Sequence, residues 1–490
     1  MVFTTAGGGA SQLYPYEIDN SLRFNDGDNP KLAFTPSSQV LAEKKTFTIS
    51  CWFKRSNLTS YQYLWEMGGN DNANDRFFAR LQNTDSLRIM DSTTTFRETN
   101  RLFRDPSAWY HLVVAVDTTD GTAGDRIKIY VNGVQETSFA TSNNPPLNAE
   151  KGFSDNSAHT IGRTGVGDSS SFDGYMADFY AVGGSQLAPT SFGETNDNGV
   201  WIPKKYTGSY GTNGFKLEFK QTGTSQNSSG MGADTSGNDN HFAVTNLAAT
   251  DVTTDTPTNN FCTLSSIDVN VGIVPTFEEG NTKFTVASGN NHSRTDATIR
   301  PSSGKWYAEF TFLSGYSTAN GTTQVGIISG NAGRNSSTND SYDQDNGNDS
   351  EAIGYRSNGS IVNNSGTQIL SSLTTFTTDD IMGIALDLDN DKFFVSKNGT
   401  FFTNGTGTQD PPNGTNPLFS GGVITSHKIY GFNIGAKGYG DPQNVIAANF
   451  GNPHTSISSG NADANGYGNF EYAVPSGFYS LCTKNLAEFG

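Results

Sequence analysis

Two stretches, WYHLVVAVD at residues 109–117 and IKIYVNG at residues 127–133, decide the fold of this 490-residue chain. In both, large apolar side chains occupy every second position, which is the period of a β-strand with one buried face. The second stretch ends in Asn132-Gly133, a pair that accepts the positive φ angles required at both central positions of a type I′ turn. The two stretches therefore predict two strands and a tight hairpin, whose return strand begins at Val134.

The same order of features returns in the second half of the chain. IMGIALD at residues 381–387 alternates in the same way, an acidic turn follows at residues 389–391, and a further apolar strand leads into Asn398-Gly399. The recurrence indicates two copies of one kind of β unit, spaced too widely for a solenoid. We therefore expect an all-β protein of two antiparallel β-sandwiches. The residues expected on the buried strand faces are Tyr110, Leu112, Val114, Val116, Ile127, Ile129, Val131, Ile384, Leu386, Leu388, Phe393 and Val395.

The composition narrows the class of protein. Lys and Arg number 31 against 48 Asp and Glu, and the net charge of −17 repels phosphate groups, so nucleic acid is not expected as a partner. Charged residues make up 16% of the chain and glycines number 55, so the surface is polar without being ionic. Aromatic residues at 12% argue against disorder. No apolar run approaches the ~18–20 residues that span a bilayer, so membrane insertion is not expected.

The cysteines and the N-terminal segment bear on where the protein is made. Cys51, Cys262 and Cys482 are far apart, so neither a disulfide framework nor a metal-binding spacing is present, and Cys51 is expected in a core. MVFTTAGGGASQ at residues 1–12 has neither the basic stretch nor the apolar run of a secretory signal. We expect synthesis in a host cytoplasm without a signal peptide and release by a route such as lysis, which virion components take.

The segment between the two copies is rich in Gly, Ser, Asn and Thr, as in TGTSQNSSGMGADTSGN at residues 222–238, which is the composition of a linker. It also holds apolar anchors, including Trp201, so we expect a partly ordered connector packed on the first domain. DTPTNN at residues 255–260 marks a domain boundary. The expected organisation is an attachment segment (residues 1–20), a first sandwich (21–190), the connector (191–275), a second sandwich (276–450) and a C-terminal extension (451–490).

Several of these segments carry a family resemblance. WYHLVVAVD, IKIYVNG and FDGYMADFYAV at residues 172–182 come in the order found in a laminin-G or concanavalin-A-like jelly roll. GKWYAEFTF at residues 304–312, AIGYRSNGSI at residues 352–361 and DIMGIALDLDNDKFFVSKNG at residues 380–399 resemble a SPRY domain, which is also a concanavalin-like sandwich. The resemblance implies two concanavalin-like jelly rolls, one on each side of the Gly/Ser/Asn-rich connector.

The pairing of the two domains carries a second resemblance. Together with WIPKKYTGSYGTNGF at residues 201–215 and VPSGFYSLCTKNL at residues 474–486, it is similar to structural proteins of tailed bacteriophages. Those proteins are generally assigned to tail fibres, receptor binding or virion surfaces. The resemblance implies a virion role more loosely than it implies the fold, because sandwich folds host many functions.

The acidic and histidine residues give no catalytic pattern. Retaining concanavalin-like glycosidases need two carboxyl groups about 5–5.5 Å apart, and the nearest candidates are Asp387 and Asp389 on one strand face. We interpret this pair as a solvated strand end, and Glu17 and Asp19 lack the third acid of a Glu-x-Asp-x-x-Glu signature. The six histidines are scattered, which fits neither a metal cluster nor a Ser/His/Asp triad, and we interpret His111 as a surface strand residue. The protein is therefore expected not to be an enzyme.

Binding of a glycan needs less than catalysis, because an aromatic platform and a few polar partners on loops suffice. Tyr61, Tyr63 and Trp65 alternate and are candidates for such a platform, the alternative being an exposed or interface strand. A second candidate surface lies on loops between the SPRY-like strands and includes Tyr316, Tyr342 and Asp343. No cofactor is expected apart from calcium, for which the loop at residues 340–351 offers oxygen ligands or is simply an exposed turn. The calcium candidates are Asp343, Asp345 and Asp349.

The leading hypothesis is a noncatalytic virion surface protein, most simply a tail fibre or surface fibre, that is attached to a phage tail or capsid through its N-terminal segment. Its loops would bind a host-surface glycan or protein. Self-assembly, with a trimer favoured, is expected because a weakly charged polar surface can be buried without stranding many ions. The alternatives are a capsid decoration protein, a concanavalin-like polysaccharide depolymerase and a cellular lectin-like adhesin.

Overall fold

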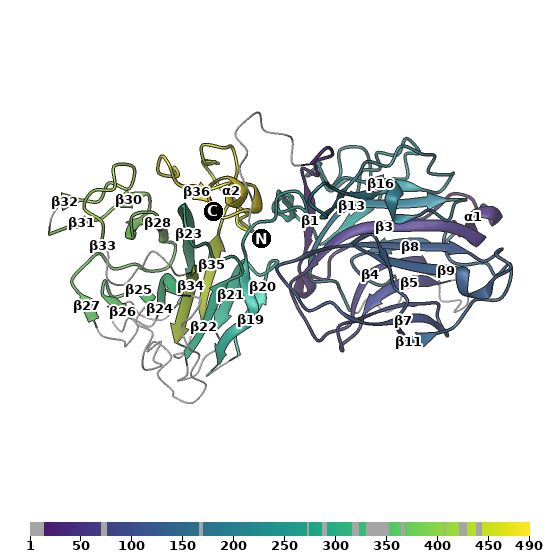
Figure 1. Cartoon of the computed structure of the whole chain (residues 1–490), viewed down its shortest axis with the longest axis horizontal. Helices are drawn as coiled ribbons and strands as arrows, with labels where there is room; N and C mark the ends of the chain where they lie inside the picture. Colours follow the sequence, from purple (N-terminus) through teal and green to yellow (C-terminus); the bar gives the residue numbers. More distant parts are fainter. Residues whose placement is uncertain are drawn as a thin grey trace. The chain divides into compact units, whose positions relative to one another are not determined.

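The computed structural model describes residues 14–69, 76–165, 170–271, 274–286, 292–315, 323–329, 352–363, 368–405, 407–420, 429–437 and 443–490. The chain forms two compact units, Met1–Thr258 and Asn259–Gly490, and both are built from β-sheets (Figure 1). The all-β fold class is therefore confirmed. The short helices are η1 (Asp26–Asp28), α1 (Leu41–Lys45), η2 (Ala123–Asp125), η3 (Pro189–Ser191), η4 (Ala249–Asp251) and α2 (Thr483–Phe489). Among the described residues, none of the helices has the length and apolar character needed to cross a membrane.

One sheet of the first unit has the strand order β10-β9-β8-β3-β13-β1-β18, with β16 paired to β13. Its strands are β10 (Val134–Gln135), β9 (Ile127–Val131), β8 (Trp109–Asp117), β3 (Thr46–Arg55), β13 (Gly174–Gly183), β1 (Ser21–Phe24), β18 (Val252–Thr253) and β16 (Phe215–Leu217). Between β9 and β10, Asn132 and Gly133 have φ angles of 48° and 80°. The predicted hairpin is thus confirmed, with positive φ at both central positions.

The other sheet of the first unit has the order β11-β7-β6-β5-β4-β12-β2-β17. Its strands are β11 (Phe139–Ser142), β7 (Thr95–Leu102), β6 (Ser86–Met90), β5 (Phe77–Leu81), β4 (Gln62–Gly69), β12 (Ala158–Ile161), β2 (Lys31–Phe34) and β17 (Ala243–Thr245). Figure 1 shows β3 and β8 in one layer and β4, β5 and β7 in the other. Cys51, Leu112 and Val114 meet Phe77 and Ile89 between the layers, so the sheets form a sandwich with a closed apolar core.

The connector supplies strands to the first unit. β16, β17 and β18 extend its two sheets, and Phe215 and Phe242 lie in its core. A separate hairpin of β14 (Gly193–Thr195) and β15 (Trp201–Pro203) brings Trp201 against Trp52, on the side of β3 that faces away from the core. The segment up to Thr258 therefore belongs to the first unit, while residues 259–275 belong to the second.

The second unit has two large sheets. Their orders are β19-β22-β34-β24-β25-β26-β27 and β20-β21-β35-β23-β28-β29-β30, with β33 paired to β29 and β36 paired to β23. The first has strands β19 (Leu264–Val271), β22 (His292–Ala297), β34 (Tyr430–Lys437), β24 (Thr323–Ser329), β25 (Ala352–Arg356), β26 (Ile361–Asn363) and β27 (Gln368–Leu370). The second has strands β20 (Thr276–Glu278), β21 (Lys283–Val286), β35 (Asn444–Asn449), β23 (Lys305–Ser314), β28 (Ile381–Asp387), β29 (Lys392–Lys397), β30 (Thr400–Phe401), β33 (Phe419–Ser420) and β36 (Tyr479–Ser480). A small hairpin joins β31 (Thr403–Asn404) to β32 (Gly407–Thr408).

The core of the second unit follows the predicted alternation. Ile384, Leu386 and Leu388 are buried in it together with Phe393 and Val395, as expected from the sequence. On the other side of the same sheet, Phe470 and Phe478 from the C-terminal extension pack on Tyr307, Ala385 and Phe394. The extension therefore covers part of the outer face of this sheet, and its residues 453–457 enclose a cavity there.

Candidate functional site

The predicted aromatic trio does not form one surface. Tyr61 is 44% exposed, Tyr63 is 8% exposed and Trp65 is fully buried in the core of the first unit. The pairing of β4 with β5 explains the difference, because Tyr63 opposes Arg80 while Trp65 opposes Ala79, so that Leu64 is an extra residue in the ladder. This bulge shifts the alternation by one, and both Leu64 and Trp65 enter the core. The prediction that Trp65 belongs to the platform was wrong, Tyr63 is nearly buried, and Tyr61 presents the exposed ring.

An arginine that was not predicted completes the surface at Tyr61. The Arg80 guanidinium lies over the Tyr61 ring at 4.7 Å and over the Tyr63 ring at 5.4 Å. Its N–H groups donate to the Tyr63 hydroxyl and to Gln82 Oε1, both at 3.4 Å. A guanidinium that lies over two rings is restrained in orientation, and the Arg80 side chain is partly exposed. We call Tyr61, Tyr63 and Arg80 the tyrosine–arginine platform.

A buried carboxylate anchors the loop that carries this platform. Asp85 Oδ1 accepts hydrogen bonds from the Thr59 backbone N–H at 2.8 Å and from Arg55 Nη1 at 3.0 Å, and Oδ2 accepts one from Arg104 Nε at 2.9 Å. Burial alone would raise the pKa of Asp85, but these donors outweigh it and lower the pKa below its ordinary value. Because Thr59 has a φ of 58°, the Asp85 contact holds a strained turn two residues before Tyr61.

The predicted binding and calcium residues of the second unit lie outside the described part of the chain. They are Tyr316, Tyr342, Asp343, Asp345 and Asp349, and their roles stay predictions. Within the part that the structure describes, no group of three or more His, Cys, Asp or Glu side chains is arranged to hold a metal ion.

The acidic pair considered for catalysis is engaged in structural contacts. Asp387 is fully buried, pairs with Lys305 Nζ at 3.1 Å and accepts hydrogen bonds from the Asn390 side-chain amide. Asp389 Oδ1 accepts the backbone N–H of Gly304 at 2.7 Å. The interpretation of a solvated strand end was therefore wrong for Asp387, because Lys305 on the neighbouring strand β23 compensates its charge.

His111 was expected at the surface but is buried between two tryptophans. Its ring stacks on Trp52 at 4.7 Å and on Trp201 at 5.9 Å. Trp201 Nε1 donates to His111 Nδ1 at 3.0 Å, so the neutral ring carries its proton on Nε2, which lies 2.8 Å from Ser50 Oγ. Burial lowers the pKa of His111 to about 3. The surface prediction failed because the β14–β15 hairpin covers this face of β3 and β8.

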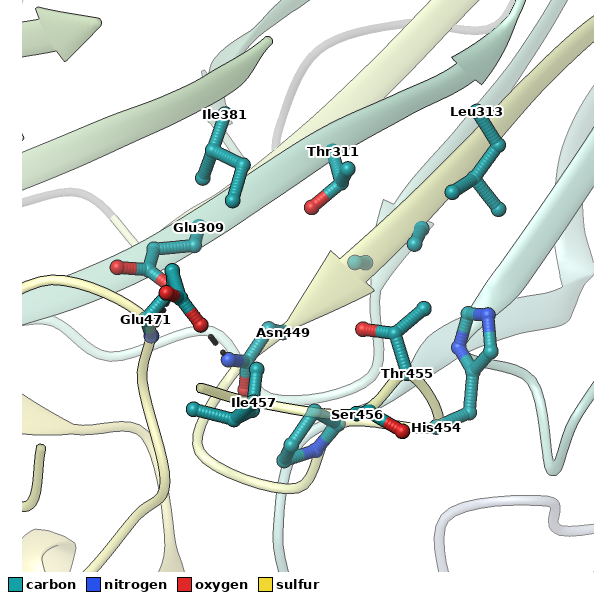
Figure 2. A pocket seen from close by; sticks show the side chains of 13 residues that line it. Glu309, Thr311, Leu313, Ile381, Asn449, His454, Thr455, Ser456, Ile457 and Glu471 are labelled. Atoms are coloured by element: carbon teal, nitrogen blue, oxygen red, sulfur yellow. Dashed lines mark hydrogen bonds between the residues drawn. The ribbon is translucent and has the colours of Figure 1, made fainter. Parts of the chain in front are cut away.

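The second unit contains a cavity of about 150 Å³ on the outer face of β23, β28 and β35. Figure 2 shows Thr311, Leu313 and Ile381 projecting from the strands, Glu309 and Glu471 at one end, and a loop across the front. The full lining is Glu309, Thr311, Leu313, Ile381, Ala447, Ala448, Asn449, Pro453, His454, Thr455, Ser456, Ile457 and Glu471. The covering loop comes from the C-terminal extension, so sequence patterns alone did not reveal the cavity.

The charged groups of this cavity serve the fold. Glu309 accepts the backbone N–H groups of Glu471 and Tyr472, each at 2.9 Å, and the Tyr307 hydroxyl at 3.1 Å. Burial raises the pKa of Glu309 above its ordinary value, although these donors oppose the shift. His454 Nδ1 lies 2.9 Å from Thr282 Oγ1 and ties down the loop. Ligand pockets usually measure about 300–1,000 Å³, so this cavity is too small to enclose a sugar chain.

Comparison with known proteins identifies the fold of the first unit. Residues 26–186 match the family model described as the concanavalin A-like lectin/glucanases superfamily. These residues form a concanavalin A-like domain. The platform and Asp85 both lie within it. A search of the curated proteins finds no matching sequence.

A search of the solved structures finds matches that include a SPRY domain, a putative carbohydrate binding protein and a pair of laminin domains. The SPRY domain of human HERC1 is 16% identical, with 38% of this chain and 96% of that chain covered and a TM-score of 0.26. A putative carbohydrate binding protein from Bacteroides ovatus is 14% identical, with 47% and 58% covered and a TM-score of 0.30. Domains LG4-5 of the mouse laminin alpha1 chain are 9% identical, with 91% and 92% covered and a TM-score of 0.30.

Proposed function

We propose that this protein is a noncatalytic glycan-binding protein and that the tyrosine–arginine platform is its sugar-binding surface. The observation that carries the proposal is the exposed ring of Tyr61, held against Arg80 on the outside of a concanavalin A-like domain. An aromatic face packs against the apolar face of a sugar ring, and neighbouring polar groups fix its orientation. Because Arg80 restrains the Tyr61 ring before any ligand arrives, little side-chain freedom is lost on binding.

The biological setting of the proposal is the surface of a tailed-bacteriophage virion, as a tail fibre or surface fibre that contacts the host. The sequence resemblance of the paired domains and connector to phage structural proteins supports this setting. The weakly charged surface, with 16% charged residues, supports assembly of several copies, for which we favour a trimer. Capsid decoration remains the closest alternative placement.

Replacing Tyr61 with alanine is expected to weaken glycan binding about tenfold, the loss of roughly 1.4 kcal/mol of contact energy. The measurement is titration of the purified full chain against a panel of host-surface glycans, with thermal unfolding to verify the fold. Val134→Ala serves as the control, because Val134 is 64% exposed on β10 of the other sheet and should leave affinity unchanged. A chain that binds no glycan in the panel, or a Tyr61→Ala variant with unchanged affinity, contradicts the proposal.

The virion setting predicts that the protein is a stoichiometric part of purified phage particles. An antibody raised against the full chain should label the tail or capsid of intact virions in negative-stain electron microscopy. The position of the label then separates a tail fibre from a decoration protein. Absence of the protein from purified particles, measured by mass spectrometry, would overturn the virion setting while leaving glycan binding to be judged by the Tyr61 experiment.

A further inference from the structure

We infer that the tyrosine–arginine platform selects a negatively charged sugar, with Arg80 as the residue that determines this specificity. The inference rests on the proposed function and names its ligand class. The ligand is a saccharide bearing an oxyanion, either the carboxylate of a uronic acid or a sulfate or phosphate ester. The Arg80 guanidinium binds the oxyanion while Tyr61 supports the sugar ring.

The local charge first distinguishes this region from the rest of the chain. Residues 76–104, which form β5, β6, β7 and their connections, contain six arginines, no lysine and three acidic residues. The whole chain carries a net charge of −17. A locally basic strip on an acidic protein attracts anions to one place and repels them elsewhere.

Arg80 differs from the other five arginines in its hydrogen-bond and ion-pair partners. Arg76, Arg88, Arg101 and Arg104 each pair with a carboxylate, on Glu66, Glu98, Glu136 and Asp85 respectively. Arg97 is buried and donates to main-chain carbonyl groups and to the Asn144 side-chain carbonyl. Among the described residues, no carboxylate lies within 4.0 Å of the Arg80 guanidinium. Its two hydrogen bonds, each 3.4 Å long, come from the Nη1 and Nη2 groups and go to neutral acceptors, while its Nε is buried and has no hydrogen-bond partner in this part of the chain.

The strand register adds an independent argument. Arg80 on β5 lies directly opposite Arg88 on β6, and Arg88 in turn lies opposite Glu98 on β7. Arg88 is compensated by Glu98, whose Oε2 accepts hydrogen bonds from Arg88 Nη2 at 2.8 Å and from Nε at 3.2 Å. Like charges directly opposite each other destabilise a sheet. An oxyanion on Arg80 would remove this repulsion and satisfy N–H groups that now make only long bonds.

The chemistry of the guanidinium defines the ligand. Its planar fork of N–H groups matches the two oxygens of a carboxylate or of a sulfate or phosphate ester, which it binds bidentately. The rings of Tyr61 and Tyr63 hold the fork in place, so the site is arranged before binding. Because the site is half-exposed, binding should weaken as salt screens the attraction.

The test uses the full chain and three polymers, namely polygalacturonate for carboxylate, dextran sulfate for sulfate ester and dextran as the neutral reference. Arg80→Gln is expected to lower affinity at least tenfold for whichever charged polymer binds, and to lower affinity for neutral dextran by a smaller factor, because Tyr61 then loses only the restraint on its ring. Arg80→Lys keeps the charge but loses the fork and should recover only part of the affinity. The control Lys204→Gln also removes one half-exposed positive charge from the first unit, and should change affinity less than twofold.

The outcomes separate this inference from the proposed function. Arg80-dependent binding of polygalacturonate identifies a carboxylate ligand, and Arg80-dependent binding of dextran sulfate identifies an ester; either result supports the inference. Tyr61-dependent binding of neutral glycans with no preference for charged polymers overturns the inference and leaves glycan binding intact. Equal losses in Arg80→Gln and Lys204→Gln also overturn it, because the effect would then follow net charge alone.

Discussion

Replacing Asp85 with alanine is expected to lower the free energy of unfolding of the first unit by about 3–5 kcal/mol, the usual cost of removing one partner of a buried ion pair. The Arg55 and Asp85 side chains are 0% and 1% exposed, and their Nη1 and Oδ1 atoms lie 3.0 Å apart. Without Asp85, the Arg55 charge would stay buried with the Phe103 carbonyl, at 2.7 Å, as its remaining acceptor among the described residues, and the Thr59 N–H would lose its acceptor. Such a loss is a large part of the roughly 5–15 kcal/mol by which a typical domain is stable.

Chemical denaturation followed by tryptophan fluorescence measures this effect on the right unit, because Trp52, Trp65, Trp109 and Trp201 lie in the first unit and only Trp306 lies in the second. Asp85→Asn keeps a hydrogen-bond acceptor for Thr59 but removes the charge, so its loss should be intermediate. Asp197→Ala is the surface control, since Asp197 is exposed in the turn before β15 and has no positive φ angle, and should change stability by less than about 0.5 kcal/mol. A loss below 1 kcal/mol in Asp85→Ala would contradict the assignment of Asp85 as an anchor.

The same substitution tests how the platform is supported. Asp85 holds the Thr59 turn, which leads into Tyr61, so Asp85→Ala should weaken glycan binding even under conditions where the unit is still folded. Asp85→Asn should bind more tightly than Asp85→Ala, because its side-chain oxygen still accepts the Thr59 N–H. If both variants bind glycan equally well, the Asp85 contact with Thr59 does not support the platform.

The fold followed from sequence because its signals are local. Alternation places Leu112 and Ile384 in their cores, and the Asn132-Gly133 pair forces a turn by its own backbone preferences. The platform could not be predicted from the sequence, because the alternation of apolar residues does not show where a strand contains a β-bulge. The bulge at Leu64 sends Trp65 into the core, and only the register between β4 and β5 brings Arg80 to Tyr63.

The burial of polar residues could not be predicted from the sequence either, since it depends on segments that are distant in the chain. His111 sits on the face of its strand that alternation assigns to solvent, yet Trp201, 90 residues later, covers it. Asp387 ends a strand that leads into an exposed turn, yet Lys305 compensates it from a neighbouring strand. The cavity beside Glu309 exists because the C-terminal extension crosses the sheet. The sequence of that extension has no periodic pattern from which its packing position could be predicted.

His111 should make the first unit sensitive to acid. Its pKa is about 3 in the folded chain, because the ring is buried, whereas an unfolded histidine has a pKa of 6.5. Below about pH 6.5 the unfolded chain therefore binds a proton that the folded chain does not, so the free energy of unfolding falls as the pH falls, and this continues until about pH 3. Well inside this window each pH unit costs about 1.4 kcal/mol. Because the unfolded histidine is only half protonated at pH 6.5, the loss from pH 6.5 to pH 4.5 is about 2 kcal/mol from this residue.

The measurement is the free energy of unfolding of the first unit at several pH values between 7 and 4, for the full chain and for His111→Gln. The variant is less stable at pH 7, because glutamine cannot stack between Trp52 and Trp201, but its stability should fall less steeply with acid by about 1.4 kcal/mol per pH unit. Trp201→Phe is the matched control: it removes the N–H donor to Nδ1 but keeps a ring over the histidine, so the steep acid dependence should persist. Equal slopes in the full chain and in His111→Gln would show that the imidazole between the tryptophans does not drive the acid response.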